Sequence, residues 1–547
     1  MAIRPIREPR APLSAALMHP IEWAHGRLLR VLEWFNQERW SLALTLLALI
    51  VANLGILFFF LQGQDNRAIA FTILILLAPL TFLLPTLSVT IFIVLGAGLF
   101  GNVMYYALGQ GQGTGIRVLT LTFGLILTAR AAYEYLRTPR EERPRLMGWL
   151  TGAILLFWVY LMMHAGYIYF FRYNEVPASS IEGALGLYRP GLFRYFDYHM
   201  LWIGIIPIVI LLRNFERLKQ VAVLLGVIMA IGLGSVVWEY FAPLPEFFKI
   251  LFQLRAAAET AEGYRVRDPA SLYLFIVGFF YALYMLGFLK GSRNFFALLF
   301  VAGATFAILI TKNRILWAGI LLMLPIVLLW KPPQALMRQV VVLGIAALAF
   351  LAMMLYPPIY DSVSRITTET LERWNRNYAY GGDPRLDPSY QFRVREREAW
   401  EATWAQMTWS ERLVGRGLEA TYGMYLSIDK AGGPKIYRQS YIEKTHMHFS
   451  WLARLLHMGY LGVALLGLLI VVFFVKSVYT FIHIKALFVR ATVIGVAGST
   501  FGLLAYDAIH TDMLASPPAL PVILMWSILP LAWHWHRTGQ LERAENA

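Results

Sequence analysis

The chain of 547 residues contains no cysteine, which excludes disulfide bonds, a thiolate nucleophile and cysteine metal ligands. It also lacks a P-loop, a G-x-S-x-G elbow and an ATP-binding domain, so a pump driven by nucleotide hydrolysis is disfavoured. The first twenty residues are basic but carry no apolar core followed by a small-residue cleavage site. A cleavable signal peptide is therefore not expected.

Charged residues are scarce, at 15% of the chain against about 25% in soluble domains. Hydrophobic residues make up 58%, and several apolar runs exceed the roughly 20 residues that cross a bilayer. This pattern predicts an all-α, polytopic integral membrane protein with about 14 transmembrane helices. Much of the net charge of +15 lies in short loops, where it sets topology, so no nucleic-acid partner is expected.

Polar loops divide the chain into five parts. We expect a basic, amphipathic cytoplasmic segment at 1–39, transmembrane helices over 40–356, a large and partly helical loop at 357–447, transmembrane helices over 448–536 and a cytoplasmic tail at 537–547. Among the expected spans are 118–136, 147–170, 200–212, 220–241, 271–289, 294–310, 315–330, 338–356, 449–475, 488–506 and 517–535.

The distribution of basic residues gives the orientation. Lys and Arg are more frequent in the expected inside segments than in the outside loops when the large loop is left out. The large loop and two medium loops, 172–198 and 242–270, are then periplasmic in a bacterium. The loop at 137–146 is cytoplasmic.

His448 lies where the polar run of the large loop becomes an apolar helix. Gly459 and Gly462 follow after eleven and fourteen residues, and on a continuous helix they point within roughly 20° and 40° of the histidine. Two interpretations stay open. Either the histidine is a functional group at a membrane boundary, with glycines that admit a neighbouring helix, or it is an interfacial histidine beside packing glycines.

Arginines stand beside aromatic residues in the regions expected outside. They are Arg189, Arg265, Arg267, Arg314, Arg393, Arg395 and Arg397. Arginine forks match diphosphate oxygens and stay charged at any working pH. One face of a helix near residue 400 would carry Arg393, Arg397 and Trp400, whereas Arg395 points elsewhere. Snorkelling is the alternative role for Arg314, and pairing with neighbouring glutamates is the alternative for Arg395 and Arg397.

Metal-ligand spacing is not found on the expected outer face. Acids are sparse around His448, and the one mixed group is Asp507, His510 and Asp512. We therefore expect no resident metal and no other cofactor. The G-R-G run at 415–417 is too short for a nucleotide loop and predicts a tight turn at a helix end.

At these residues, over about 264–475, the sequence resembles the O-antigen ligase and polymerase superfamily of bacterial inner membranes. His448, Gly459 and Gly462 are similar to its C-terminal signature, although Phe449 stands where Asn, Ser or Gln is usual. Three further stretches resemble superfamily motifs: the glycines Gly415, Gly417 and Gly423, the span-end motif Asn313, Arg314 and Trp317, and a long-loop arginine among Arg393, Arg395 and Arg397. Glu396 occupies the position four residues before Trp400 where the superfamily usually has that arginine.

The resemblance implies a metal-independent, inverting glycosyltransferase at the periplasmic face of the inner membrane. The donor would be an undecaprenyl-diphosphate-linked glycan, and the acceptor a second glycan or a lipid A core, among membrane lipids. His448 would be the general base, while Arg314 and long-loop arginines would stabilise the diphosphate leaving group. Polymerase and ligase both remain possible outcomes of this resemblance.

Two other classes of protein stay open. A transporter or flippase of lipid-linked glycans would carry ionisable groups at mid-membrane depth. The charges of this chain instead cluster at span ends, which argues against that class, and Arg454, six residues into an expected span, is the exception. A structural or sensory membrane protein would use the large loop to bind a partner. Its arginines would not converge on His448.

Overall fold

The computed structural model describes residues 84–96, 112–145, 148–171, 204–241, 255–260, 263–267, 272–310, 314–357, 360–361, 363–364, 367–368, 388–418, 420, 422–428, 438–444, 449–508 and 520–546. The segment 1–39, the loop 172–198 with Arg189, and His448 lie outside these residues. The side chains of Arg265, Arg267 and Arg314 also lie outside the described part, although their backbone is within it.

Five described helices are long and apolar enough to cross a membrane. They are α7 (Trp149–Phe171), α11 (Phe215–Phe241), α14 (Ser292–Ile310), α20 (Ser450–His483) and α21 (Leu487–Asp507). Each coincides with an expected span, so the prediction of a helical membrane protein is confirmed at this level. The sequence predicts about 14 spans, and some of these lie in segments outside the described residues.

The described chain contains further helices. The apolar ones among them are α13 (Leu272–Met285), α15 (Arg314–Leu329) and α16 (Pro333–Met353). The others are α4 (Pro85–Gly96), α6 (Gln112–Arg137), η1 (Arg140–Glu142), α10 (Ile205–Leu211), α18 (Pro388–Ala405), α19 (Trp409–Val414), α22 (Leu520–Leu524), η6 (Met525–Ser527), α23 (Ile528–Arg537) and α24 (Gln540–Asn546).

Two β-hairpins, which the sequence does not predict, lie in the loops of this helical architecture. Strands β1 (Arg255–Thr260) and β2 (Gly263–Arg267) pair antiparallel, as do β3 (Tyr422–Ile428) and β4 (Arg438–Lys444). In the second hairpin Tyr422 pairs with Lys444 and Ile428 with Arg438. Tyr, Ile and Val in these short runs favour strands, and an antiparallel pair fits within a single loop.

Helix α13 is the centre of the described core. Phe275, Ile276 and Phe280 are fully buried, as expected of a helix that is apolar all round. Helix α21 packs closely against α13 because Gly495 has no side chain. A Cβ at that position would lie 2.7 Å from the Val277 carbonyl oxygen. The Ser499 hydroxyl also donates a hydrogen bond to the Tyr273 carbonyl at 3.0 Å.

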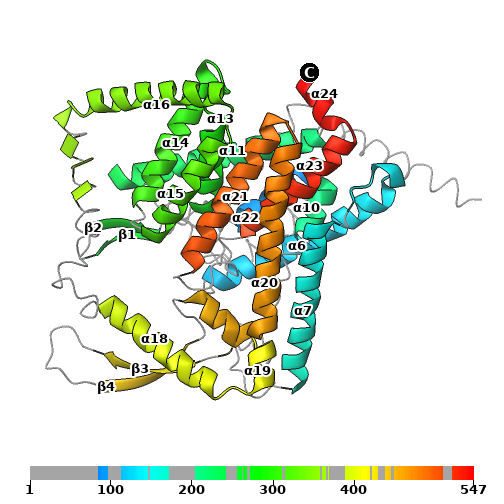
Figure 1. The fold of residues 1–547 in the computed structure, drawn as a ribbon, viewed down its shortest axis with the longest axis vertical. Helices are drawn as coiled ribbons and strands as arrows, with labels where there is room; N and C mark the ends of the chain where they lie inside the picture. Colours follow the sequence, from blue (N-terminus) through cyan, green and yellow to red (C-terminus); the bar gives the residue numbers. More distant parts are fainter. Residues whose placement is uncertain are drawn as a thin grey trace, which may run out of the picture.

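Segments of the large loop and the expected cytoplasmic tail lie at opposite ends of the molecule. Helices α18 and α19 and the β3–β4 hairpin, from the large loop, lie at the lower end in Figure 1, and α24 lies at the upper end. The expected inside segments also contact one another. Trp535 donates to the Arg213 carbonyl at 2.8 Å, and Arg537 donates to the Arg143 carbonyl at 3.4 Å.

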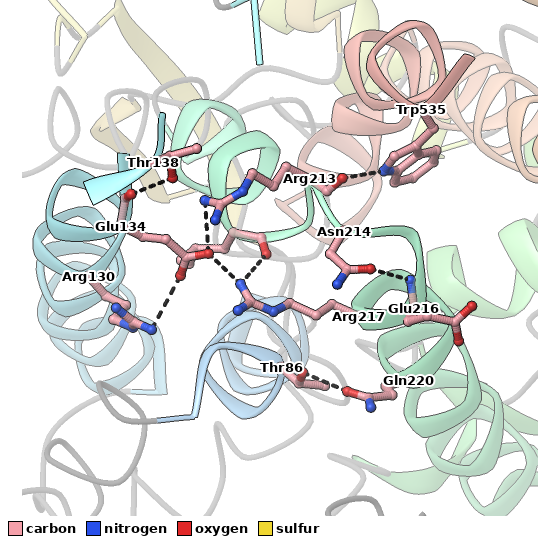
Figure 2. Close-up of polar contacts among 11 residues, drawn as sticks. Thr86, Arg130, Glu134, Thr138, Arg213, Asn214, Glu216, Arg217, Gln220 and Trp535 are labelled. Carbon is pink, nitrogen blue, oxygen red and sulfur yellow. Dashed lines mark hydrogen bonds and ion pairs between the residues drawn. The ribbon is translucent and has the colours of Figure 1, made fainter. Parts of the chain in front are cut away.

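A cluster of charges ties these inside segments together. Glu134 at the end of α6 accepts ion pairs from Arg130, Arg213 and Arg217 at 3.3, 3.0 and 2.5 Å. Figure 2 shows the three guanidinium groups converging on this one carboxylate from α6, from the α10–α11 connection and from the first turn of α11. The basic residues that set the predicted topology therefore also hold α6 to the start of α11.

Helix α16 departs from its expected course. The sequence predicts a span over 338–356, but α16 lies across the upper ends of its neighbours in Figure 1. Its first turns are anchored because the buried Lys331 ammonium donates to the Leu283 and Leu286 carbonyls, at 2.8 and 2.7 Å, and to the Gln339 side chain. Farther along, Val340, Ile345 and Leu348 are exposed.

Candidate functional site at the start of helix α20

Helix α18 packs directly on the first turns of α20. The buried Trp400 donates its indole N–H to the Leu452 carbonyl at 2.8 Å, and Trp404 stacks on Trp400 with ring centroids 5.1 Å apart. A small apolar cluster surrounds this contact, formed by Trp400, Met407, Ala420, Tyr422, Ala453 and Leu456, with Phe449 packed against it. The large loop is thereby fixed to the stretch that begins directly after His448.

Helix α20 is kinked at Gly459, where φ is 65° and ψ is −174°. The kink receives the turn after α19, because the Arg416 and Gly417 N–H groups donate to the Leu456 and His457 carbonyls at 2.8 and 3.0 Å. Gly415 ends α19 with φ of 87°, so the tight turn predicted for 415–417 is present.

The kink corrects the geometry expected from the sequence. Treating His448, Gly459 and Gly462 as one face assumes a continuous helix, but the helical path changes direction at Gly459. This glycine admits the last turn of α19 and the start of the turn that follows it, since a Cβ there would overlap the Leu413 carbonyl and the Gly415 nitrogen. Only glycine adopts this backbone conformation without strain.

Gly462 does admit a neighbouring helix. A Cβ at Gly462 would lie 2.8 Å from the ring of Tyr160 on α7. The Tyr160 hydroxyl also reaches the Val414 carbonyl at 3.0 Å and the Met458 carbonyl, and it therefore joins the turn after α19 to α20 beside the kink. Three segments of the chain meet at this point.

A buried ion pair locks the first two turns of α20 to the end of α21. Arg454 and Asp507 are both fully buried, and two N–H···O contacts of 2.5 and 2.8 Å join them in a bidentate geometry. The Ser450 hydroxyl donates to the Asp507 backbone carbonyl in the same place. The sequence marks Arg454 as an exception within an apolar span and Asp507 as part of a mixed acidic group, but it does not show that they pair.

The three long-loop arginines have different environments on α18. Arg393 is half-buried, and its buried Nε has no hydrogen-bond partner among the described residues. Arg397 is exposed and pairs with Glu401 at 2.7 Å, whereas Arg395 is exposed. Of the three arginines, Arg393 is therefore the one with an N–H group that is partly shielded from water and available to a ligand.

Glu396, which stands where the superfamily usually has an arginine, is buried against the β3–β4 hairpin. It is only 1% exposed and accepts a hydrogen bond from the Tyr422 hydroxyl at 3.3 Å. Burial, helped by the nearby Glu396 carboxylate, raises the pKa of Tyr422 well above its usual range. The tyrosine therefore stays protonated and donates, which fixes the β3–β4 hairpin to α18.

The remaining sequence candidates are placed only by their backbone or not at all. Arg314 is the first residue of α15, and Trp317 in the first turn of that helix is buried and donates to the Ile308 carbonyl at 2.9 Å. Arg265 and Arg267 lie on β2, where Arg267 pairs in register with Arg255. Arg189 and His448 lie outside the described residues.

One cavity beside α20 and the distribution of possible metal ligands complete the description of this region. An apolar cavity of about 320 Å³ lies between α15, α20 and α21, lined by Trp330, Phe474 and Val493 among others. It belongs to the half of α20 far from Ser450. The described residues contain no group of three or more His, Asp or Glu side chains that could hold a metal ion.

Comparisons of the chain with family models, with curated proteins and with solved structures find no match.

Proposed function

We propose that this protein is a metal-independent, inverting glycosyltransferase that takes a glycan from undecaprenyl diphosphate at the outer face of a bacterial inner membrane. Its product is a polymerised or ligated surface polysaccharide. The observation that supports the proposal best is the packing of α18 on α20. This contact brings an arginine-bearing helix of the large loop to the stretch that follows His448.

In this proposal His448 accepts the proton of an acceptor-sugar hydroxyl, and that oxygen attacks the anomeric carbon of the donor. The bond from the anomeric carbon to the diphosphate oxygen breaks, and the configuration at that carbon inverts. Arg314 and Arg393 stabilise the charge that grows on the departing diphosphate. Half-burial strengthens such a contact, because fewer water molecules screen the guanidinium of Arg393.

The Arg454–Asp507 pair supports an enzyme over a transporter of lipid-linked glycans. Arg454 is the one exception in the sequence to charges that cluster at span ends, and an ionisable residue at membrane depth can belong to a transport pathway. Its charge is instead neutralised by a fully buried carboxylate on the neighbouring helix. An arrangement of this kind fixes two helices and leaves no net charge for a passing substrate.

The histidine is tested by product formation with purified protein, a lipid-diphosphate-linked glycan and a defined acceptor. We expect His448→Ala to lower turnover about 10²- to 10⁴-fold while donor binding persists, as for removal of a general base. His483→Ala is the matched control, since this exposed histidine lies at the opposite end of α20 and should keep full activity. A stable His448→Ala protein with normal turnover would remove the histidine from the mechanism.

The arginines of α18 provide a second comparison. Arg393→Ala should weaken donor binding and turnover, whereas Arg395→Ala, which removes the same charge from an exposed position on the same helix, should not. Arg393→Lys should rescue only partly, because an ammonium cannot reproduce the guanidinium fork. Equal effects of Arg393→Ala and Arg395→Ala would show that α18 acts only through its general charge.

A genetic experiment separates the two products that the proposal allows. Deletion of the gene with analysis of surface polysaccharide should leave either single repeats or unligated polymer on the lipid carrier. Single repeats identify a polymerase, and carrier-linked polymer with loss of lipid A-attached glycan identifies a ligase. Unchanged polysaccharide of every class contradicts both.

A further inference from the structure

A second basic region lies at the other end of the molecule, where the start of α7, the end of α20 and the end of α23 meet. These ends enclose a cavity of about 440 Å³. Its charged lining consists of Arg145, Lys476 and Arg537, and His534 and His536 add two imidazoles. No carboxylate lines this cavity among the described residues.

These three cations have no acidic partner within the described part of the chain. Arg537 donates to the Arg143 carbonyl at 3.4 Å, and the Lys476 ammonium lies over the rings of Trp149 and Tyr479 at 5.5 and 5.1 Å. The arginines beside Glu134 differ, since Arg130, Arg213 and Arg217 share its carboxylate (Figure 2). The cavity therefore gathers positive charge that the described residues do not neutralise.

His534 gives an independent indication of a ligand. It is only 4% exposed, it lines the cavity, and its Nδ1 has no hydrogen-bond partner in the described part of the structure. A buried polar atom without a partner costs about 1–3 kcal/mol in general, so natural proteins seldom keep one without a reason. An imidazole N–H that donates to an anionic oxygen in the cavity would satisfy it.

The apolar part of the lining has the character of a bilayer interface. Trp149 at the start of α7 is 74% exposed, and Trp533, Leu529 and Pro530 complete the wall. Tryptophan is enriched at the headgroup level of membranes. Exposed apolar side chains continue from the cavity along α20, where Val475, Val471 and Leu468 offer a path for an acyl chain.

We propose that this cavity binds the phosphate headgroup of an anionic phospholipid from the membrane leaflet at this end of α7 and α20. Arg145, Lys476 and Arg537 compensate the phosphate charge, His534 donates to a phosphate oxygen, and the acyl chains follow the exposed apolar side of α20. A soluble phosphate would use the same cations but would leave Trp149 and the apolar row without a role. The site lies at the opposite end of α20 from His448 and does not depend on the proposed function.

Native mass spectrometry of the purified full-length protein tests the site. The protein is titrated with phosphatidylglycerol and, separately, with phosphatidylcholine of the same acyl chains. We expect at least about tenfold tighter binding of the first phosphatidylglycerol molecule. Lys476→Gln should weaken that binding about fivefold, the effect of losing one basic residue near an anionic membrane surface. The triple variant Arg145→Gln, Lys476→Gln and Arg537→Gln should lose the preference.

The control is a triple variant of exposed cations on the same side of the predicted topology, Lys290→Gln, Arg293→Gln and Arg338→Gln. It removes the same charge and should keep the preference for phosphatidylglycerol. Equal binding of the two lipids by the wild type, or equal losses in the two triple variants, would overturn the proposal. Inorganic phosphate that displaces phosphatidylglycerol at equal concentration would also overturn it and would assign the site to a soluble anion.

Discussion

Replacing Asp507 by Asn tests whether the buried ion pair positions the start of α20. Asn has nearly the shape of Asp, so the substitution removes one charge and takes the Asp507 carboxylate away from the fully buried Arg454. The hydrogen bond from Ser450 ends on the Asp507 backbone carbonyl and is not touched by the change. The perturbation is therefore confined to the charge.

The expected cost follows from the burial of both partners. Both side chains are 0% exposed and joined by contacts of 2.5 and 2.8 Å. Breaking a buried pair from one side costs about 3–5 kcal/mol, because the remaining charge stays desolvated. Replacing both partners with apolar residues, as in Arg454→Met with Asp507→Leu, is often neutral or stabilising by about 1–4 kcal/mol. The double variant should therefore be more stable than Asp507→Asn alone.

The assay is a reversible denaturant titration in mixed micelles, followed by circular dichroism, together with the glycosyl-transfer assay. Glu401→Gln is the control, since it breaks the exposed Arg397–Glu401 pair, and a surface pair contributes only about 0.2–1 kcal/mol. A cost for Asp507→Asn no larger than this control would refute the reasoning. A double variant that is stable and fully active would refute the positioning role while leaving the stability argument intact.

Three further predictions concern the kink, a buried lysine and the topology. Gly459→Ala should destabilise the protein by at least about 1 kcal/mol, because φ is positive at this residue. Gly467→Ala has open space at its Cβ and should be neutral or stabilising by about 0.5–1 kcal/mol. Thermal unfolding of the two variants measures the difference. Burial lowers the pKa of Lys331 from 10.5 to about 7, so with rising pH the native state loses this proton before the unfolded state does. The free energy of unfolding should therefore rise from about pH 7 to pH 10, by up to about 1.4 kcal/mol per pH unit. Lys331→Met should flatten that rise, and an unchanged profile would contradict the assignment. Single cysteines in this cysteine-free chain should react with an impermeant thiol reagent in intact cells within 357–447 but not within 137–146, and the reverse pattern would overturn the orientation.

The spans were predictable because apolar length is a local property of the sequence. The starts and ends of α7, α14 and α21 fall within a few residues of the expected spans. The tight turn at Gly415 was predictable for the same reason, since glycine pairs mark positive φ.

What the sequence did not predict depends on contacts between distant residues. The kink at Gly459 arises because a loop some forty residues earlier inserts against it, and a helical face calculated for a straight helix carries no sign of that loop. Likewise, Arg454 and Asp507 are 53 residues apart, and each alone resembles an isolated charge. The β-hairpins were missed because two short strands pair with each other and have no periodic signal long enough to separate from a polar loop.

Three different contacts fix the first turns of α20. Given the proposed function, they support a role for these turns in positioning His448. Trp400 holds Leu452, Asp507 holds Arg454, and the turn after α19 holds the kink at Gly459. A buried ion pair is a weak source of net stability, because desolvation offsets most of its Coulomb energy. Apolar residues would hold two helices together as well, but they would allow a range of rotations and shifts. A bidentate pair allows one geometry, and the stretch it fixes begins two residues after His448, where a general base must be held within a few tenths of an ångström of its productive position.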